Sequence, residues 1–290
     1  MGKIYRSLIY DEQVSLSVLE TTDIVNQAIT YHALSPVCAA ALGRSLTATA
    51  FMACGLKDKK EKLSVTINGG GLGGHIVTAA DGELHIRGSI DVPDVEIPLK
   101  PNGKLDVSAV TGKNGYITVI KDLGLKEPYI GRSMLVSGEI AEDFTAYYAY
   151  SEQQPTAMAL GVLIGTDGKC IGAGGLVLQP MPGCNDENIN KSESLMSKFT
   201  DISRQIYEIG GKGICDKYFS NVKFTEYNPI YKCNCSREYI DKVLLTVGER
   251  ELIAEAESNG QVEVSCQFCN RKYIYYLSDI KELFKKTDEK

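Results

Sequence analysis

The sequence lacks several features that would point directly to a function. It has no Gly-Lys-Ser/Thr phosphate-binding loop and no nucleophile elbow. Histidine is scarce, and its three positions, His32, His75 and His85, give little support to an enzyme that uses histidine as acid or base. Positive charge is also in short supply, because 31 Lys and Arg face 37 Asp and Glu, for a net charge of -6. The chain is therefore not predicted to bind nucleic acid, which selects a basic surface.

The sequence also lacks a convincing leader or membrane span. Residues 1–10 do not contain the apolar core of a signal peptide. The longest weakly polar stretch, 36–56, carries Arg44 near its middle, and a central arginine opposes membrane insertion by roughly 2.5 to 3.5 kcal/mol. Ser35 as N-cap and Pro36 at the first helical position instead predict a buried helix. We expect no membrane association.

The nine cysteines do not form the pattern of a secreted disulfide framework. Five have no paired spacing and are interpreted as buried or inert thiols, namely Cys38, Cys54, Cys170, Cys184 and Cys215. An odd number of cysteines at scattered positions suits a reducing compartment. The expected location is the cytoplasm.

Residues 1–178 alternate extended and helical patterns, which predicts an α+β domain of helices and antiparallel strands. Helices are predicted to start at Thr22 and Pro36 and to cover residues 140–151. Strands are predicted over residues 4–10, 14–19, 63–68, 75–80, 83–89, 95–99, 116–122, 132–137, 158–164 and 170–179.

A composition change at Gln179-Pro180-Met181-Pro182-Gly183 predicts a domain boundary, since two prolines and a glycine stop regular structure. Over residues 179–230 apolar side chains recur at helical spacing but are interrupted by glycines. Short helices of this kind need a surface to lie on, so the segment is interpreted as a docked, metastable helical linker. Its apolar side chains are Ile189, Leu195, Met196, Phe199, Ile202, Ile206 and Ile209.

Residues 231–290 form a third part, which contains four cysteines and few large aliphatic side chains. So small a core predicts that metal binding supplies much of its folding free energy. Its ten Lys and Arg are balanced by eleven Asp and Glu, so it lacks the positive field of a nucleic-acid-binding zinc ribbon.

Two further patterns match functional signatures but have structural explanations. Gly69-x-Gly71-x-x-Gly74 fits a dinucleotide fingerprint, yet a strand rather than a helix is predicted after it, so a turn is favoured. Four acidic residues flank the helix at 140–151 and are interpreted as caps and solvated charges, namely Glu139, Glu142, Asp143 and Glu152.

The most informative pattern is Cys233-Asn234-Cys235 followed, after thirty residues, by Cys266-Gln267-Phe268-Cys269. Two short loops can present four thiolates to one tetrahedral zinc ion. Four cysteine ligands leave no open position for an activated water, so catalytic zinc is not predicted. The same sulfurs are two oxidisable dithiols, and spacing alone leaves both a structural and a redox-sensing zinc open.

The wider sequence resembles a known family. The cysteines stand in Lys232-Cys233-Asn234-Cys235-Ser236 and Val264-Ser265-Cys266-Gln267-Phe268-Cys269-Asn270. Further strings are Ala41-Leu42-Gly43-Arg44, Ser137-Gly138-Glu139-Ile140-Ala141-Glu142-Asp143, Ser151-Glu152-Gln153-Gln154-Pro155-Thr156, Gly174-Gly175-Leu176 and Gln179-Pro180-Met181-Pro182-Gly183. Together these strings resemble the redox-regulated heat shock protein 33 family, the 33 kDa chaperonins, over essentially the whole chain.

The resemblance implies an ATP-independent holdase without catalytic residues, which binds unfolded or partly folded client proteins under oxidative stress. It implies one zinc ion per chain on Cys233, Cys235, Cys266 and Cys269 in the reduced, inactive form. Oxidation, with unfolding stress, would release zinc and form one disulfide between Cys233 and Cys235 and one between Cys266 and Cys269. The resemblance also implies a homodimer after activation, with dimerisation and client binding in residues 1–178.

The sizes of the two disulfide rings add an expectation about the order of oxidation. A Cys-x-Cys disulfide closes the smaller, more strained ring, so Cys266 and Cys269 are predicted to oxidise more readily than Cys233 and Cys235.

The alternative to a chaperone is an enzyme in the α+β domain beside an inert zinc module. That alternative predicts a polar, ligand-sized pocket, for example near Gly69 and Gly74.

Overall fold

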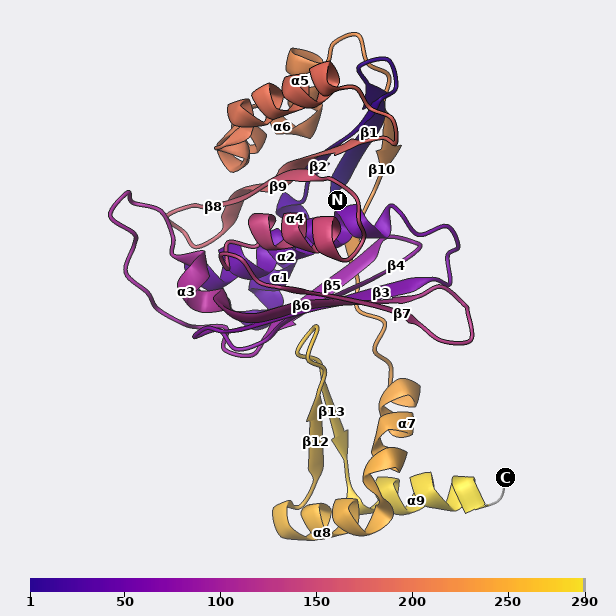
Figure 1. The fold of residues 1–290 in the computed structure, drawn as a ribbon. Helices are drawn as coiled ribbons and strands as arrows, with labels where there is room; N and C mark the ends of the chain where they lie inside the picture. The colour runs from indigo at the N-terminus through magenta and orange to yellow at the C-terminus, as the bar shows by residue number, and fades with distance from the viewer. Residues whose placement is uncertain (289–290) are drawn as a thin grey trace. The chain divides into compact units, whose positions relative to one another are not determined.

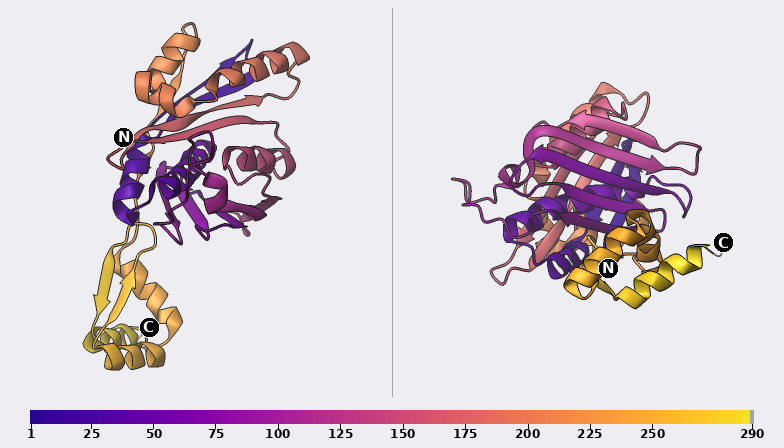
Figure 2. Two further views of the ribbon diagram at one scale, coloured as in Figure 1. Left: turned by 90° about the vertical axis from the view of Figure 1, so that its left-hand side faces the viewer. Right: turned by 90° about the horizontal axis from the view of Figure 1, so that it is seen from below.

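Two β-sheets enclose one buried helix in the larger part of the chain (Figures 1 and 2). The computed structural model describes residues 1–288, and the chain divides into a first unit, Met1–Lys232, and a second unit, Cys233–Lys290. Within residues 1–288, no helix is both long enough and apolar enough to cross a membrane. The mixture of helices and mainly antiparallel strands confirms the predicted α+β class.

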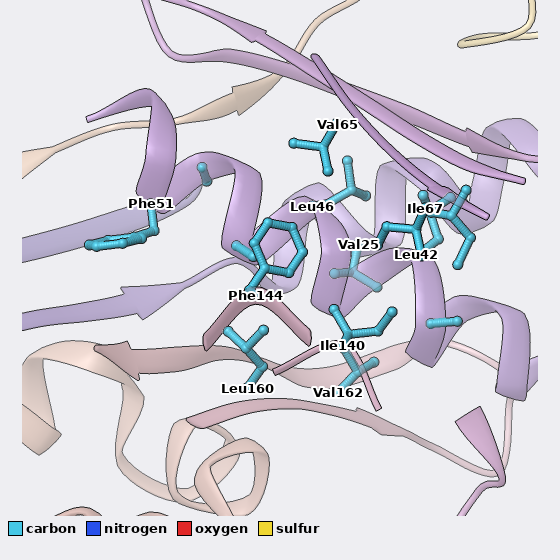
Figure 3. Packing of buried hydrophobic residues seen from close by; sticks show 14 of the residues in the cluster. Val25, Leu42, Leu46, Phe51, Val65, Ile67, Ile140, Phe144, Leu160 and Val162 are labelled. Carbon is cyan, nitrogen blue, oxygen red and sulfur yellow. The ribbon is translucent and has the colours of Figure 1, made fainter. Parts of the chain in front are cut away.

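The buried helix is α2, Pro36–Ala53, and it forms as predicted. The Ser35 hydroxyl accepts a hydrogen bond from the Cys38 backbone N–H at 3.4 Å, and every residue after Pro36 except Arg44 is buried. Its small side chains permit the close approach of both sheets. Leu42 and Leu46 lie between side chains of both sheets, among them Val65, Ile67, Leu160 and Val162 (Figure 3).

The five-stranded sheet has the order β10-β1-β2-β9-β8 and is antiparallel throughout. In that order its strands are Thr225–Tyr227, Lys3–Ile9, Val14–Glu20, Cys170–Pro180 and Ala157–Ile164. The six-stranded sheet has the order β11-β5-β4-β3-β6-β7, with β11 parallel to β5. Its strands are Ile230–Tyr231, His85–Ile90, Ile76–Asp81, Lys62–Gly70, Gly112–Asp122 and Tyr129–Met134.

Three more helices complete the two-sheet body, namely α1 (Thr22–His32), α3 (Val107–Thr111) and α4 (Ala141–Tyr150). At the start of α4 the buried Asp143 carboxylate accepts hydrogen bonds from four backbone N–H groups, of Val136, Ser137, Gly138 and Ile140. This carboxylate is a cap, as the sequence predicted.

The predicted strand at residues 95–99 is wrong. Pro98 lies inside that stretch and has no N–H to donate to a sheet, so the chain forms a loop there. Ser35 holds this loop, because its backbone N–H donates to the Pro93 carbonyl at 2.8 Å and its hydroxyl donates to the Val95 carbonyl at 2.7 Å. The strand predicted at 132–137 is β7, which begins and ends earlier, at Tyr129 and Met134.

The linker consists of α5 (Asp186–Met196), a short 3-10 turn and α6 (Ile202–Tyr218), and it covers the outer face of the five-stranded sheet (Figure 1). Its apolar side chains form a second core with β1, β2 and β9. The members of this linker cluster include Leu195, Phe199, Ile202, Ile206, Leu16, Val18, Leu176 and Leu178. Ile209, predicted to be apolar contact surface, is instead 40% exposed, next to the kink that Gly210 makes with its φ of 68°.

After the linker, residues 225–231 add one short strand to each sheet, and we call this segment the strap. Strand β10 pairs with β1, where Ile4 lies opposite Tyr227, and β11 pairs with β5. The Tyr231 hydroxyl donates to the Gly88 carbonyl at 2.9 Å, and the Lys232 N–H donates to the Ile86 carbonyl at 2.9 Å. The strap thus binds the last part of the first unit to both sheets.

The second unit is a β-hairpin with three helices. Its strands are β12 (Val262–Ser265) and β13 (Lys272–Tyr275), and its helices are α7 (Arg237–Val247), α8 (Glu249–Asn259) and α9 (Leu277–Asp288). A small group of buried side chains forms its core: Ile240, Leu244, Leu252, Ala256, Val262, Cys266, Tyr273, Tyr275 and Ile280.

Candidate metal centre

Two loops of the second unit bring the four paired cysteines together. Cys233 and Cys235 lie in the extended segment before α7, and Cys266 and Cys269 lie in the turn between β12 and β13. The turn is closed by hydrogen bonds from the Cys269 and Asn270 N–H groups to the Cys266 carbonyl, at 3.3 and 2.8 Å. Asn270 takes a left-handed conformation with φ of 53°, which asparagine tolerates well.

The four sulfurs have the spacing that a tetrahedral metal ion needs. All four Sγ atoms lie within 4.8 Å of one another, and the distances are 3.5 Å between Cys233 and Cys266 and 3.4 Å between Cys235 and Cys269. Zinc bonded to four thiolates at about 2.3 Å places its sulfurs about 3.8 Å apart. The cluster is therefore able to hold a metal ion, and its all-sulfur donor set suits zinc.

The protonation of these thiols explains why a cation matters. Burial raises the pKa of Cys269 to about 11, and burial, together with the neighbouring thiols, raises the pKa of Cys233 still further. At Cys235 burial also opposes ionisation, but hydrogen bonds from Tyr273 and the neighbouring thiols outweigh it and lower the pKa to about 7. Cys233 and Cys269 are therefore thiolates at neutral pH only with a bound cation, whose binding releases their protons.

Tyr273 is a contributor to the centre that the sequence pattern did not reveal. Its hydroxyl donates a hydrogen bond to the Cys235 Sγ at 3.2 Å, from strand β13. Such a contact orients a sulfur and stabilises its thiolate form. The sequence offers no local signal for this contact, because Tyr273 and Cys235 are 38 residues apart. The structure places Tyr273 on the same face of β13 as the buried Tyr275.

The five remaining cysteines are dispersed through the first unit, as expected for structural thiols. Cys38, Cys170 and Cys215 are buried, and Cys54 and Cys184 are partly exposed. Burial raises the pKa to about 11 at Cys54 and Cys170 and to about 12 at Cys215, so these three thiols are protonated at neutral pH and react slowly.

Gly69 and Gly70 end strand β3, and residues 71–74 form a turn, as favoured from the sequence. The backbone N–H groups of Gly71, Leu72 and Gly73 donate to carbonyl groups of α3 and are not available to a phosphate. Strand β4 follows, so no helix N-terminus is present at this turn. Two surface hollows adjoin this stretch. One of 360 Å³ has neither a histidine nor a carboxylate among its described lining residues, and one of 420 Å³ includes His75 and Arg132 in its lining.

The acidic residues around α4 have different roles. Glu142 is exposed, as predicted for a solvated charge. Glu139 and Glu152 were wrongly interpreted, because both are largely shielded and ion-paired. Glu139 binds Arg44 at 2.9 Å and also Lys100, while Glu152 accepts from Lys121 at 2.7 Å and from the Tyr147 hydroxyl at 2.5 Å.

Comparisons with known proteins agree with this architecture. The Hsp33 protein family model matches residues 2–276. The 33 kDa chaperonin of Ruminiclostridium cellulolyticum is 42% identical over 275 residues, which cover 92% of each chain. That of Clostridium tetani is 40% identical and covers 98% of each chain.

A solved structure extends the agreement to three dimensions. The crystal structure of the 33 kDa chaperonin (heat shock protein 33 homolog) from Thermotoga maritima matches with a TM-score of 0.90 at 32% identity. The match covers 100% of this chain and 99% of that one. The resemblance inferred from the cysteine strings is confirmed, and the chain belongs to the Hsp33 family of chaperones.

Proposed function

We propose that the chain is a redox-regulated, ATP-independent holdase, which binds unfolding proteins under oxidative stress and is not an enzyme. The observation that carries the proposal is the cluster of four thiols in the second unit, next in sequence to a linker whose apolar side chains are covered by a sheet. One part can sense an oxidant and the other can expose apolar surface.

In the reduced state one zinc ion binds Cys233, Cys235, Cys266 and Cys269 and keeps the second unit folded. Metal binding to such sites contributes about 10 to 16 kcal/mol, which is large beside the small core of this unit. Zinc also holds the sulfurs as thiolates, the form that reacts with oxidants.

Peroxide then converts the site to two disulfides, one between Cys233 and Cys235 and one between Cys266 and Cys269. Each disulfide forms when two thiolates lose two electrons, and these electrons with two protons from the solvent reduce one peroxide molecule to two waters. The disulfides cannot serve as four thiolate ligands, so zinc leaves and the second unit unfolds.

Release of the linker follows through the strap. The linker cluster is buried by the sheet of the first unit, and the chain runs from α6 through the strap directly to Cys233. An unfolded second unit no longer restrains the end of the strap, which adds conformational freedom next to β11. Under heat or another unfolding stress the linker then undocks and exposes Leu195, Phe199, Ile202 and Ile206.

The test is a titration of peroxide against zinc release and client aggregation, with mild heat and without nucleotide. Release of one zinc per chain should coincide with suppressed aggregation of an unfolding client. Cys266→Ser should bind zinc poorly and respond abnormally to peroxide, whereas Cys184→Ser should behave as wild type. Retained zinc, or released zinc with unchanged client aggregation, would reject the proposal.

The order of oxidation gives a finer test. Cys266 and Cys269 should form the first disulfide, since a Cys-x-Cys ring is more strained. Mass spectrometry of partly oxidised protein reports the order, and a Cys233 to Cys235 bond in the earliest product would contradict it.

The remaining expectations belong to the same proposal. Residues 1–178 serve dimerisation and client binding, 179–230 form the conditional linker, and 231–290 form the redox switch. The protein works in the cytoplasm, without nucleic-acid or membrane partners, and dimerises on activation. Sedimentation of the reduced and oxidised forms tests the last point.

A further inference from the structure

The larger of the two hollows beside the glycine-rich turn lies on the outer face of the six-stranded sheet. Its volume of 420 Å³ is within the range of small-molecule sites in proteins. Polar side chains and glycines line it, and no carboxylate or aliphatic side chain is among its described lining residues. These residues are Thr66, Asn68, Gly70, His75, Asn114, Gly115, Tyr116, Thr118 and Arg132.

A bulge between β3 and β6 shapes this polar hollow. The pairing of the two strands is regular up to Asn68, but the next two residues of β3 both lie opposite Gly112 of β6. Residues 113–115 therefore have no partner on β3 and form a bulge, a feature that often re-aims side chains at functional sites. Gly115 permits this close approach, because a Cβ there would lie 1.9 Å from the Asn68 carbonyl oxygen. A Cβ on Gly70 would meet nothing within 4 Å, so the hollow is open on that side.

The side chains next to the bulge occupy outward positions of regular strands. Thr66 of β3 lies opposite Thr118 of β6, which in turn lies opposite Arg132 of β7, so the three form one cross-strand row. At alternate positions Val65 and Val119 face inward and belong to the core around α2. A rigid sheet therefore fixes the positions of the three polar side chains.

Arg132 brings a positive charge that the protein does not neutralise. The central carbon of its guanidinium lies 3.7 Å from the centre of the Tyr116 ring. This stacking holds the planar group in place and leaves the N–H groups at its edge available. Within residues 1–288, Arg132 makes no ion pair and no hydrogen bond. A fixed guanidinium without a carboxylate partner attracts an anion and can donate two parallel hydrogen bonds to its oxygens.

His75 lines the hollow from the side of β4, two strands away from β7. The Asp91 carboxylate accepts hydrogen bonds from the His75 backbone N–H at 2.8 Å and from its Nδ1 at 2.7 Å. This pairing orients the imidazole ring and leaves Nε2 available for another contact. Asp91 itself packs against Gly74 and is outside the lining, so its carboxylate faces His75 and not the hollow.

Four more side chains of the lining have hydrogen-bonding groups that the protein does not use. The hydroxyls of Thr66 and Thr118 and the carboxamides of Asn68 and Asn114 make no hydrogen bond within the described part of the chain. A hydroxyl both donates and accepts, and a carboxamide has two N–H donors and one acceptor oxygen. Groups of this kind match the hydroxyls of a sugar, whereas the lining has no aliphatic surface for an apolar ligand.

We propose that this hollow binds a sugar phosphate, with the phosphate group on Arg132. Thr118 is next to Arg132 in the row, and His75 approaches from the side of β4, so polar groups surround the anion from several directions. That arrangement suits a phosphate, which has three free oxygens, better than a planar carboxylate. Asn68 and Asn114 then bind the sugar hydroxyls. The inference adds a small-molecule ligand to a protein whose proposed function uses none, at a site apart from the four clustered thiols.

The experiment uses full-length, reduced, zinc-loaded protein and isothermal titration calorimetry. The probe is ribose 5-phosphate, and the comparison ligands are ribose, which has no charge, and gluconate, a hydroxylated carboxylate. Ribose 5-phosphate should bind, ribose should not, and gluconate should bind roughly tenfold more weakly. Arg132→Gln should weaken binding of ribose 5-phosphate roughly tenfold or more, since it removes the charge that binds the phosphate.

Lys126→Gln is the matched control, because it also removes one positive charge. Lys126 is exposed in the connection between β6 and β7 and does not line the hollow, so this variant should bind as wild type. Equal weakening by both variants would show that the overall charge of the protein, and not a site, attracts the phosphate.

A second measurement uses wild-type protein and does not depend on the folding of a variant. In NMR spectra, ribose 5-phosphate should shift the amide signals of residues 66–70 and 114–118 and leave those of residues 237–283 unchanged. Absence of binding, binding of ribose or gluconate as tight as that of ribose 5-phosphate, unchanged binding by Arg132→Gln, or shifts confined to other residues would overturn the proposal.

Discussion

The two units are stabilised in different ways. The first surrounds α2 with two sheets and buries a large set of aliphatic and aromatic side chains. The second has a small core, four clustered thiols and several apolar side chains left exposed, among them Tyr239 at 59% and Val247 at 50%. A large core is stable under both reducing and oxidising conditions. A unit that folds around a metal ion is stable only while its cysteine ligands stay reduced.

The linker falls between these two extremes. Its helices are short and polar on one side, and a single apolar face attaches them to the five-stranded sheet. The comparison teaches that the buried apolar surface is distributed unevenly along the chain, with the smallest core in the unit that contains the four clustered thiols. Four experiments can break or sharpen this comparison.

Removal of the metal should have the largest effect. Chelation, or Cys266→Ser, should remove about 10 to 16 kcal/mol of metal-dependent stabilisation and unfold the second unit, while the first unit stays folded. NMR spectra should lose the dispersed signals of residues 237–283 and keep those of residues 1–178. Cys184→Ser is the control, and dispersed signals from both units after chelation would refute the contrast.

Truncation of the linker's central aromatic should have the next largest effect. Phe199 is fully buried, and its ring lies 5.0 Å from that of Tyr218. Phe199→Ala should destabilise linker docking by about 3 to 5 kcal/mol and speed amide exchange in α5 and α6 accordingly. Tyr207→Ala, at a position 57% exposed, should leave exchange unchanged, and equal effects of the two variants would contradict the docked linker.

The ion pairs of Glu139 should contribute less to the free energy of unfolding, and their contribution should depend on pH. Burial by itself raises the pKa of this carboxyl, but hydrogen bonds from Lys100 and Arg44 outweigh it and hold the pKa below its ordinary value of 4.5. A lowered pKa in the folded state stabilises the protein above the unfolded pKa, and this contribution disappears as the pH falls through the folded value.

Glu139→Gln should therefore destabilise the first unit by about 1 to 3 kcal/mol at neutral pH. Urea unfolding of both proteins should show a difference that shrinks between about pH 6 and about pH 3. Glu142→Gln, at an exposed position of the same helix start, is the control. A difference that grows in acid would show that the sign is wrong.

The smallest effect concerns a polar contact within the second unit. The buried Tyr275 hydroxyl donates to Asp241 at 2.7 Å, and the Arg237 guanidinium lies 4.3 Å from the ring centre. Tyr275→Phe should lose about 1 kcal/mol, seen as roughly fivefold weaker zinc retention against a chelator. Tyr276→Phe, 55% exposed, should retain zinc normally. A large loss from Tyr275→Phe would mean that the core, and not the metal, dominates this unit.

Much of the fold was predictable because local signals were strong. Ser35 and Pro36 marked the start of α2, and the strands predicted at 158–164 and 170–179 are β8 and β9. The four cysteines were predictable as one cluster from their spacing alone. In each case neighbouring residues determine the structure, so the sequence pattern contains the information.

The features that the sequence did not predict depend on contacts between residues far apart in the chain. Strands β10 and β11 are only a few residues long and exist because the edges of two sheets pair with them. Tyr273 of β13 reaches Cys235, which lies in the segment before α7. Glu139 and Glu152 bind partners that no local pattern identifies.

The strap has a consequence for how the chain is made. Strand β1 leaves the ribosome first, yet its outer neighbour β10 is among the last parts of the first unit to be synthesised, since Ile4 pairs with Tyr227. Until residues 225–231 have emerged, β1 and β5 are edge strands of their sheets and can pair with other chains, whereas in the complete fold β10 and β11 cover them. A nascent chain therefore completes its large unit and begins its metal site at almost the same moment, so a chaperone of this design passes through a phase in which it needs protection itself.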